Sequence, residues 1–100
     1  MLIIAGTVTV DPAERDRVLD AVAPMVAASR AEDGCHEYVF TPDPHDPAQV
    51  RLFELWESQG ALDAHFASAH MAEWQALAAD LPITGRDILK YQVSDVGPVR

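Results

Sequence analysis

The sequence predicts an α+β protein of the ferredoxin-like class, with one four-stranded antiparallel sheet and its helices on one face. Two observations support this prediction. Four segments rich in β-branched and aromatic residues alternate with segments whose apolar residues recur every three or four positions. Their order along the chain is β-α-β-β-α-β, the split βαβ arrangement. With 100 residues, we expect a single domain, residues 1–100.

The first half of the chain supplies a strand, a helix and a second strand. Residues 2–10, LIIAGTVTV, are rich in β-branched side chains and predict the first strand. Asp11 and Pro12 are typical of a helix N-cap and of the first helical position. The helix that follows places these side chains on one face: Val18, Val22, Met25, Val26 and Ser29. Gly34 ends this unit, and residues 35–41, CHEYVFT, predict the second strand.

The second half begins with a loop and closes with the last strand. Residues 42–49, PDPHDPAQ, contain three prolines, which cannot sit inside a sheet. Residues 50–57, VRLFELWE, predict the third strand. Ser58 and Ser68 are each suited to cap a short helix. Residues 84–93, TGRDILKYQV, predict the fourth strand.

The third strand carries large apolar side chains on both faces. Leu52 and Trp56 point to one side, whereas Phe53 and Leu55 point to the other. A sheet that is apolar on both faces needs a cover on both. For a chain of this length the simplest second cover is another copy of itself, so we expect a homodimer with the two sheets face to face.

Charge and cysteine content exclude several classes of protein. The net charge of −9 argues against nucleic acid or an anionic membrane as a partner, because both need a basic surface. The chain has no apolar run near the ~20 residues that span a bilayer, and MLIIAGTVTV lacks the basic start of a signal peptide. We therefore expect a cytoplasmic protein. The single cysteine, Cys35, allows neither an intrachain disulfide nor a cysteine-based zinc site.

Three segments follow one another along the chain: EDGCHEY (32–38), FELWES (53–58) and LDAHFASAHM (62–71). In this order and spacing they resemble the antibiotic-biosynthesis monooxygenase family, and its small quinol-monooxygenase-like branch in particular. The resemblance implies a dimeric α+β barrel. It also implies that O2 oxidises a reduced quinone or a polyphenolic or polyketide aromatic, with neither a metal nor an organic cofactor. Because related proteins degrade haem or isomerise small molecules, the resemblance constrains fold more than reaction.

Three residues are the candidate catalytic groups: Glu54, His65 and His70. Glu54 shares a strand face with Trp56, and burial of a carboxyl group raises its pKa toward that of a base useful near neutral pH. Neutral imidazole is the usual general base at this pH, and His65 borders the inward side of the first short helix. The family-like spacing places His70 near the mouth of the pocket. Each residue has a structural alternative, namely a hydrogen bond or ion pair that only holds the fold together.

Three aromatic residues are the candidate substrate-binding groups: Trp56, Tyr38 and Phe66. The family often has a tryptophan at the place of Trp56, which implies a wall between sheet and helices. Phe66 marks the inward side of its helix, and the Tyr38 hydroxyl could bind a substrate oxygen. Ordinary core packing is the alternative for all three.

The two histidines of the third segment also raise the question of a metal site. On a continuous helix, five residues rotate His65 and His70 about 140° apart, which is poor for shared ligation. A helix break between Ala67 and Ala69 could relieve this, but no HExxH or facial-triad spacing is present. We therefore expect no metal.

Two other functions stay open at this point. The same pocket could bind a small aromatic ligand without turnover, or the same histidines could serve an isomerase or lyase. Oxygen consumption separates the monooxygenase from both, because neither alternative uses O2.

Overall fold

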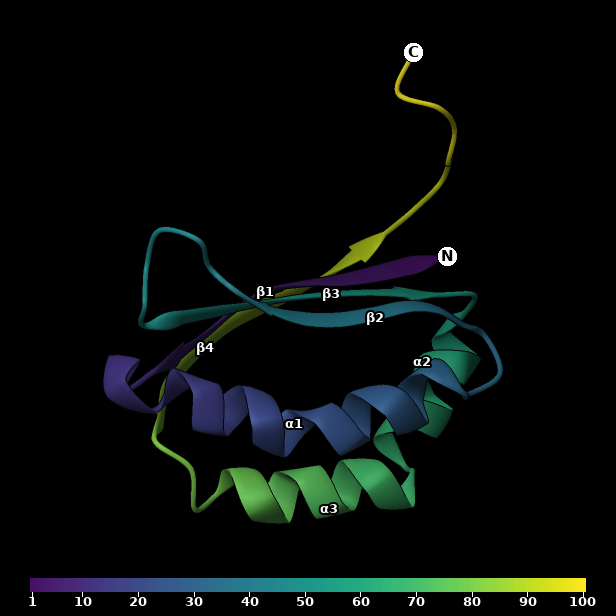
Figure 1. Ribbon diagram of the computed structural model, residues 1–100. Coiled ribbons are helices and arrows are strands. Elements are labelled where there is room, and N and C mark those ends of the chain that lie inside the picture. Colours follow the sequence, from purple (N-terminus) through teal and green to yellow (C-terminus); the bar gives the residue numbers. More distant parts are fainter.

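The computed structural model describes residues 1–100 and has one four-stranded antiparallel sheet with its helices on one face (Figure 1). This confirms the predicted fold class. In chain order the elements are β1 (Leu2–Val10), the 3₁₀ turn η1 (Pro12–Glu14), α1 (Arg15–Arg30), β2 (Cys35–Pro42), β3 (Gln49–Trp56), α2 (Gln59–Phe66), α3 (Ala69–Ala78) and β4 (Ile83–Gln92). Residues 93–100 leave the sheet as an extended tail (Figure 1).

The strands lie in the order β2-β3-β1-β4, and each neighbouring pair is antiparallel. The register places Glu54 opposite Tyr38 on one side and Ile4 on the other, and Ile4 in turn opposite Lys90. Directly opposed residues of antiparallel strands share a face. A row of four side chains therefore crosses the sheet on the side that the helices cover.

The core fills the space between this face and the helices. Its most deeply buried members include Trp56, Leu2, Leu62, Val10 and Val50. On α1, four of the five side chains that we expect to be inside are buried, whereas Val26 is only half-buried. The 3.6-residue period of this helix therefore predicts its packed face almost completely.

The three predicted caps each accept a backbone hydrogen bond. Ser58 Oγ accepts from the N–H of Ala61, 3.2 Å away, and Ser68 Oγ from that of Met71, 3.3 Å away. Asp11 Oδ1 accepts at 3.0 Å from Ala13, but it caps the 3₁₀ turn, and α1 itself begins three residues later than expected. Ser68 starts α3 in a new direction, so the chain between Phe66 and Ala69 is a break between two helices.

The other face of the sheet is bare (Figure 1). It carries apolar side chains that no element of the chain covers: Phe53, Leu89 and Tyr91 are 36%, 57% and 50% exposed. A contiguous exposed apolar surface of this kind is typical of an interaction site.

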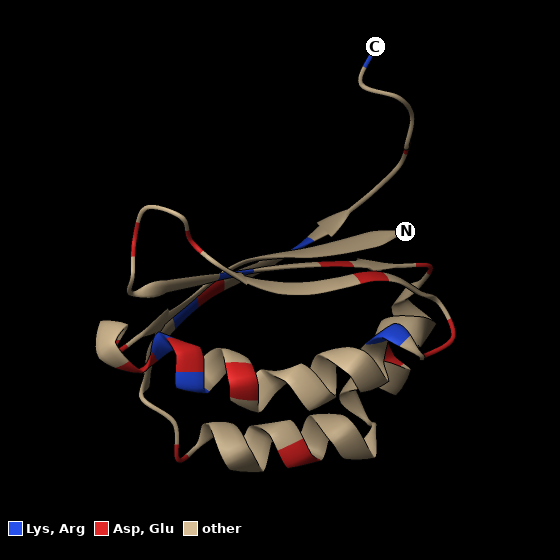
Figure 2. Cartoon of the chain, viewed as in Figure 1, with Lys and Arg blue, Asp and Glu red and all other residues tan.

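Charged residues do not gather into a basic patch. Figure 2 shows the acidic positions of the chain spread over the helices, loops and strands, with a few basic positions among them. None of the helices has the length and apolar character needed to span a membrane.

Candidate functional site

A cavity of about 400 Å³ lies between the sheet and all three helices. Ten of the 14 residues that line it are hydrophobic. The other four are Glu54, His65, Gln75 and Arg86, and Tyr38, counted with the hydrophobic residues, adds a hydroxyl group. An apolar pocket with a few converging polar groups is the usual form of a small-molecule site.

Glu54 stands in the middle of the sheet and is only 6% exposed. Its Oε1 accepts a hydrogen bond from the indole Nε1–H of Trp56 at 2.9 Å. Neither Lys90 nor Arg86 pairs with it, and the Lys90 ammonium donates to Gln59 instead. Burial therefore raises the pKa of Glu54 to about 7, despite the indole hydrogen bond. This carboxyl group can take up or release a proton near neutral pH.

His65 lies in the last turn of α2 and is 1% exposed. Its Nδ1 lies 2.7 Å from Glu32 Oε2, and its Nε2 lies 3.4 Å from the Tyr38 hydroxyl. Because an ionised carboxylate can only accept, Nδ1 carries the proton and Nε2 keeps its lone pair. Burial lowers the pKa of His65, although the Glu32 carboxylate opposes this. The imidazole is therefore neutral near pH 7, the form that accepts a proton.

Tyr38 is 2% exposed, and its ring lies edge-on to those of both His65 and Trp56. Burial, followed by the nearby charge of Glu54, raises the pKa of the Tyr38 hydroxyl well above its ordinary value. The hydroxyl stays protonated, so it is a hydrogen-bond donor and not a base.

The two other predicted wall residues lie in different places. Phe66 lines the cavity and is 55% exposed, at its open side. Trp56 does not line the cavity, contrary to the interpretation of the sequence. It is fully buried behind Glu54, with its ring centroid 4.7 Å from that of His65. Residues i and i+2 of a strand share a face, so Trp56 packs beside Glu54, to which its indole N–H donates.

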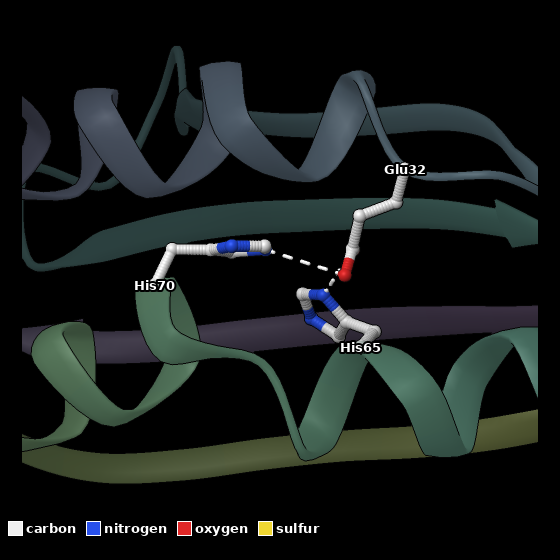
Figure 3. A group of neighbouring side chains, drawn as sticks. All are labelled: Glu32, His65 and His70. Carbon is white, nitrogen blue, oxygen red and sulfur yellow. Dashed lines mark hydrogen bonds and ion pairs between the residues drawn. The ribbon is translucent and has the colours of Figure 1, made fainter.

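His70 lies in the first turn of α3 and also stays outside the cavity, where the sequence placed it near the mouth. It lines a separate hollow with Pro24, Glu73 and Trp74. Its Nε2 lies 3.4 Å from Glu32 Oε1, so His65 and His70 approach the same carboxylate from two helices (Figure 3). Four of the six predicted residues thus line one cavity, and His70 stands behind His65.

Glu32 is the residue that the sequence interpretation missed. It lies in the turn between α1 and β2, two residues before Gly34. Gly34 has φ +81°, and a Cβ there would lie 2.7 Å from the Cβ of Ala61 in α2. Only glycine allows both the conformation and this close approach, which brings the turn against α2 and Glu32 against His65. The available signal in the sequence was Glu32 followed two positions later by Gly34, in the turn just after a helix.

The neighbouring Cys35 and His36 take no part in this site. Burial, with the charge of Glu32 next, raises the pKa of the Cys35 thiol to about 11, which disfavours the nucleophilic thiolate. His36 pairs with Glu57 on the surface.

Comparison with known proteins agrees with this fold and this order of segments. The model of the antibiotic biosynthesis monooxygenase family matches residues 1–77. A protein of Synechocystis sp. is 27% identical over 94 residues, and the match covers 94% of this chain but only 64% of that longer relative. The Escherichia coli protein named "Probable quinol monooxygenase YgiN" is 29% identical over 92 residues, covering 81% of this chain and 88% of that protein.

Solved structures show the same fold. A crystal structure of a candidate antibiotic biosynthesis monooxygenase from Deinococcus radiodurans superposes with a TM-score of 0.90. The match covers 100% of this chain and 99% of that one, at 23% sequence identity, which by itself demonstrates likeness of fold alone. The family match extends over more than half of the chain, and the protein described here therefore belongs to the antibiotic biosynthesis monooxygenase family.

Proposed function

We propose that the protein is a monooxygenase that oxidises an electron-rich aromatic substrate, a quinol or polyphenol, with O2. One observation carries the proposal: two proton acceptors, Glu54 and His65, meet a fixed donor, Tyr38, in the wall of an apolar cavity. Family membership and the name of the Escherichia coli relative support it.

The cavity suits an aromatic substrate in size and lining. Its volume of about 400 Å³ falls in the range of pockets that hold small organic ligands. Phe66 and Trp74 contribute aromatic side chains to its wall, whereas Tyr38, His65 and Glu54 contribute polar atoms from the sheet and α2. A flat ring with hydroxyl groups at one edge would satisfy both parts.

The chemistry needs a base before it needs oxygen. His65 Nε2 or the ionised form of Glu54 takes the proton of a substrate hydroxyl, and the resulting anion gives its electrons to O2 more readily. The Tyr38 hydroxyl then donates a hydrogen bond to the oxyanion. The apolar wall keeps bulk water away from the oxygen-reactive anion.

The overall reaction balances without a further reductant. A quinol and O2 form a hydroxyquinone and water: a ring carbon loses its hydrogen and gains one oxygen atom, and the other oxygen leaves as water. The substrate supplies all four electrons that reduce O2. The reaction as proposed therefore calls on no redox cofactor.

Glu32 acts in this proposal as a positioning residue. By accepting from Nδ1–H it holds the His65 ring in the tautomer whose Nε2 keeps its lone pair, toward the Tyr38 hydroxyl in the cavity wall. His70, which does not reach the cavity, would act only through Glu32.

The homodimer also belongs to this proposal, with the bare sheet face as its interface. Phe53, Leu89 and Tyr91 would be covered by the same residues of a second copy. Light scattering after size exclusion should give twice the chain mass at micromolar concentration, and a monomer there would contradict the dimer. The single domain and the cytoplasmic location stay predictions.

Oxygen uptake tests the proposed activity. We expect a panel of reduced naphthoquinones and anthrones to include a substrate that consumes O2 above the autoxidation rate. His65→Gln should abolish that excess, and His36→Ala, on the surface, should keep it. Uptake at background with every compound would sink the proposal, and equal uptake by His65→Gln would leave Glu54 as the only base. Tight binding with an unchanged ligand would instead favour a binding protein, and turnover without oxygen an isomerase or lyase.

A further inference from the structure

We infer that Glu32, His65 and His70 form a binding site for a divalent transition-metal ion of the zinc class. The three side chains come from three separate elements: the turn after α1, the end of α2 and the start of α3. Their ligand atoms all lie within 4.8 Å of one another (Figure 3).

The donor set fits such an ion. Two imidazole nitrogens and one carboxylate oxygen are a common protein ligand set for zinc and other first-row metals. Ligand atoms around a tetrahedral zinc ion stand roughly 3.3 Å apart, given metal–ligand distances of about 2.0–2.2 Å. Glu32 is 2.7 Å from His65 and 3.4 Å from His70, so an ion needs only small side-chain rotations.

One atom of this cluster has no other partner. His70 Nε2 is buried and makes no hydrogen bond, although Glu32 Oε1 lies 3.4 Å away. A buried polar atom that is left unpaired costs free energy, and each one in a folded protein calls for an explanation. An ion held between His70, Glu32 and His65 supplies the missing partner.

The site lies outside the cavity. Glu32 and His70 do not line it, and the ion would bind Nδ1 of His65, whereas Nε2 lies by Tyr38, which does line it. A ligated Nδ1 leaves the proton on Nε2, which would then donate to the Tyr38 hydroxyl as an orienting outer hydrogen bond. With the ion bound, His65 Nε2 cannot accept a proton from a substrate, and Glu54 is then the base of the proposed oxygenation. The inference rests on the geometry of the three ligands and not on that oxygenation.

This inference replaces the expectation of no metal. From the sequence, a helix break between Ala67 and Ala69 was possible, but no HExxH or facial-triad spacing indicated a metal site. The break is present, since α2 ends at Phe66 and α3 starts at Ala69. The change of direction turns both imidazoles toward Glu32, which lies more than 30 positions earlier in the chain.

Calorimetric titration of the full chain with Zn²⁺ tests the site, after removal of any purification tag and of bound metal with a chelator. We expect one ion per chain in the wild type. Loss of one of three ligands, in His70→Ala or Glu32→Gln, should weaken binding by on the order of 100-fold. Glu32→Gln is informative because its amide oxygen can still accept from His65 Nδ1–H.

Two matched controls guard against binding elsewhere. His36→Ala removes a histidine from the other His–Glu pair, and Cys35→Ser removes the thiol beside it; both should bind Zn²⁺ like the wild type. Zn²⁺ should also raise the melting temperature of these controls but not that of His70→Ala. Binding far below one ion per chain, or equal binding by His70→Ala, would overturn the inference.

Discussion

Two His–Glu pairs in this protein contain the same chemical groups in opposite surroundings. His65 and Glu32 have side chains that are 1% and 18% exposed, with Nδ1 and Oε2 2.7 Å apart. His36 and Glu57 are 42% and 60% exposed, with Nε2 and Oε2 2.5 Å apart. The contact distances are similar, so distance does not distinguish the pairs.

Burial distinguishes them. Around the surface pair, water screens the charges, and such contacts contribute little to stability. Around the inner pair, loss of water lowers the pKa of His65, and the low dielectric strengthens its hydrogen bond to Glu32. Only the inner pair adjoins the cavity that Glu54 lines, because His65 is part of its wall. The chemical properties of a His–Glu pair therefore depend on where the pair lies and not on its composition.

The largest difference between the two pairs should appear in kcat/KM when the histidine of each pair is replaced. With the substrate identified by oxygen uptake, His65→Gln should lower kcat/KM by about 10²–10⁴-fold, the usual contribution of a general base. His36→Ala should leave it unchanged. Circular dichroism of both variants checks that they are folded. Equal activity of the two variants would show that the inner pair is only structural.

The next effect concerns pH and Glu54. The pKa is about 7 in the folded protein against an ordinary 4.5, so the folded state holds this proton more tightly than the unfolded state. The stability from that proton is complete below pH about 4.5 and is lost as the pH rises through about 7. Relative to Glu54→Gln, the wild type should lose on the order of 3 kcal/mol of unfolding free energy across this range.

Denaturant unfolding at several pH values measures that difference. If Glu54 also acts as the base, kcat/KM should rise with pH through about 7 in the wild type and lack that limb in Glu54→Gln. A constant stability difference between the two proteins from pH about 4 to about 8 would contradict the raised pKa.

A smaller effect on kcat should come from replacing Glu32, the glutamate of the inner pair. Glu32→Ala, assayed free of metal, should lower kcat by roughly tenfold with KM little changed, because His65 loses its preferred tautomer. Glu32→Gln should restore most of the rate, since its amide oxygen still accepts from Nδ1. Nitrogen-15 chemical shifts of His65 report the tautomer directly, and an unchanged tautomer in Glu32→Ala would reject the positioning role.

The smallest effect belongs to the surface pair itself. Glu57→Gln should change the unfolding free energy by less than about 0.5 kcal/mol, and by less still in high salt. Thermal unfolding at two salt concentrations measures it. A larger, salt-independent change would mean that the His36–Glu57 pair also stabilises the fold.

Much of the site could be predicted because it depends on strand alternation. Glu54 and Tyr38 are helix-facing by the two-residue period of their strands, and His65 and Phe66 follow from the apolar positions around them. Trp56 has the same parity as Glu54, but parity cannot tell a cavity wall from the layer behind it. That difference depends on which neighbour lies above each side chain.

The sequence by itself determined the order of elements, the packed faces of the strands and of α1, and the family, because these depend on local periodicity and on segments read in order. Only the tertiary structure decided that Glu32 meets His65, that His70 turns toward the same carboxylate, and that the other His–Glu pair stays in water. The reason is physical: a local pattern specifies a face, whereas burial and the partners of a charge depend on chain segments far apart in sequence.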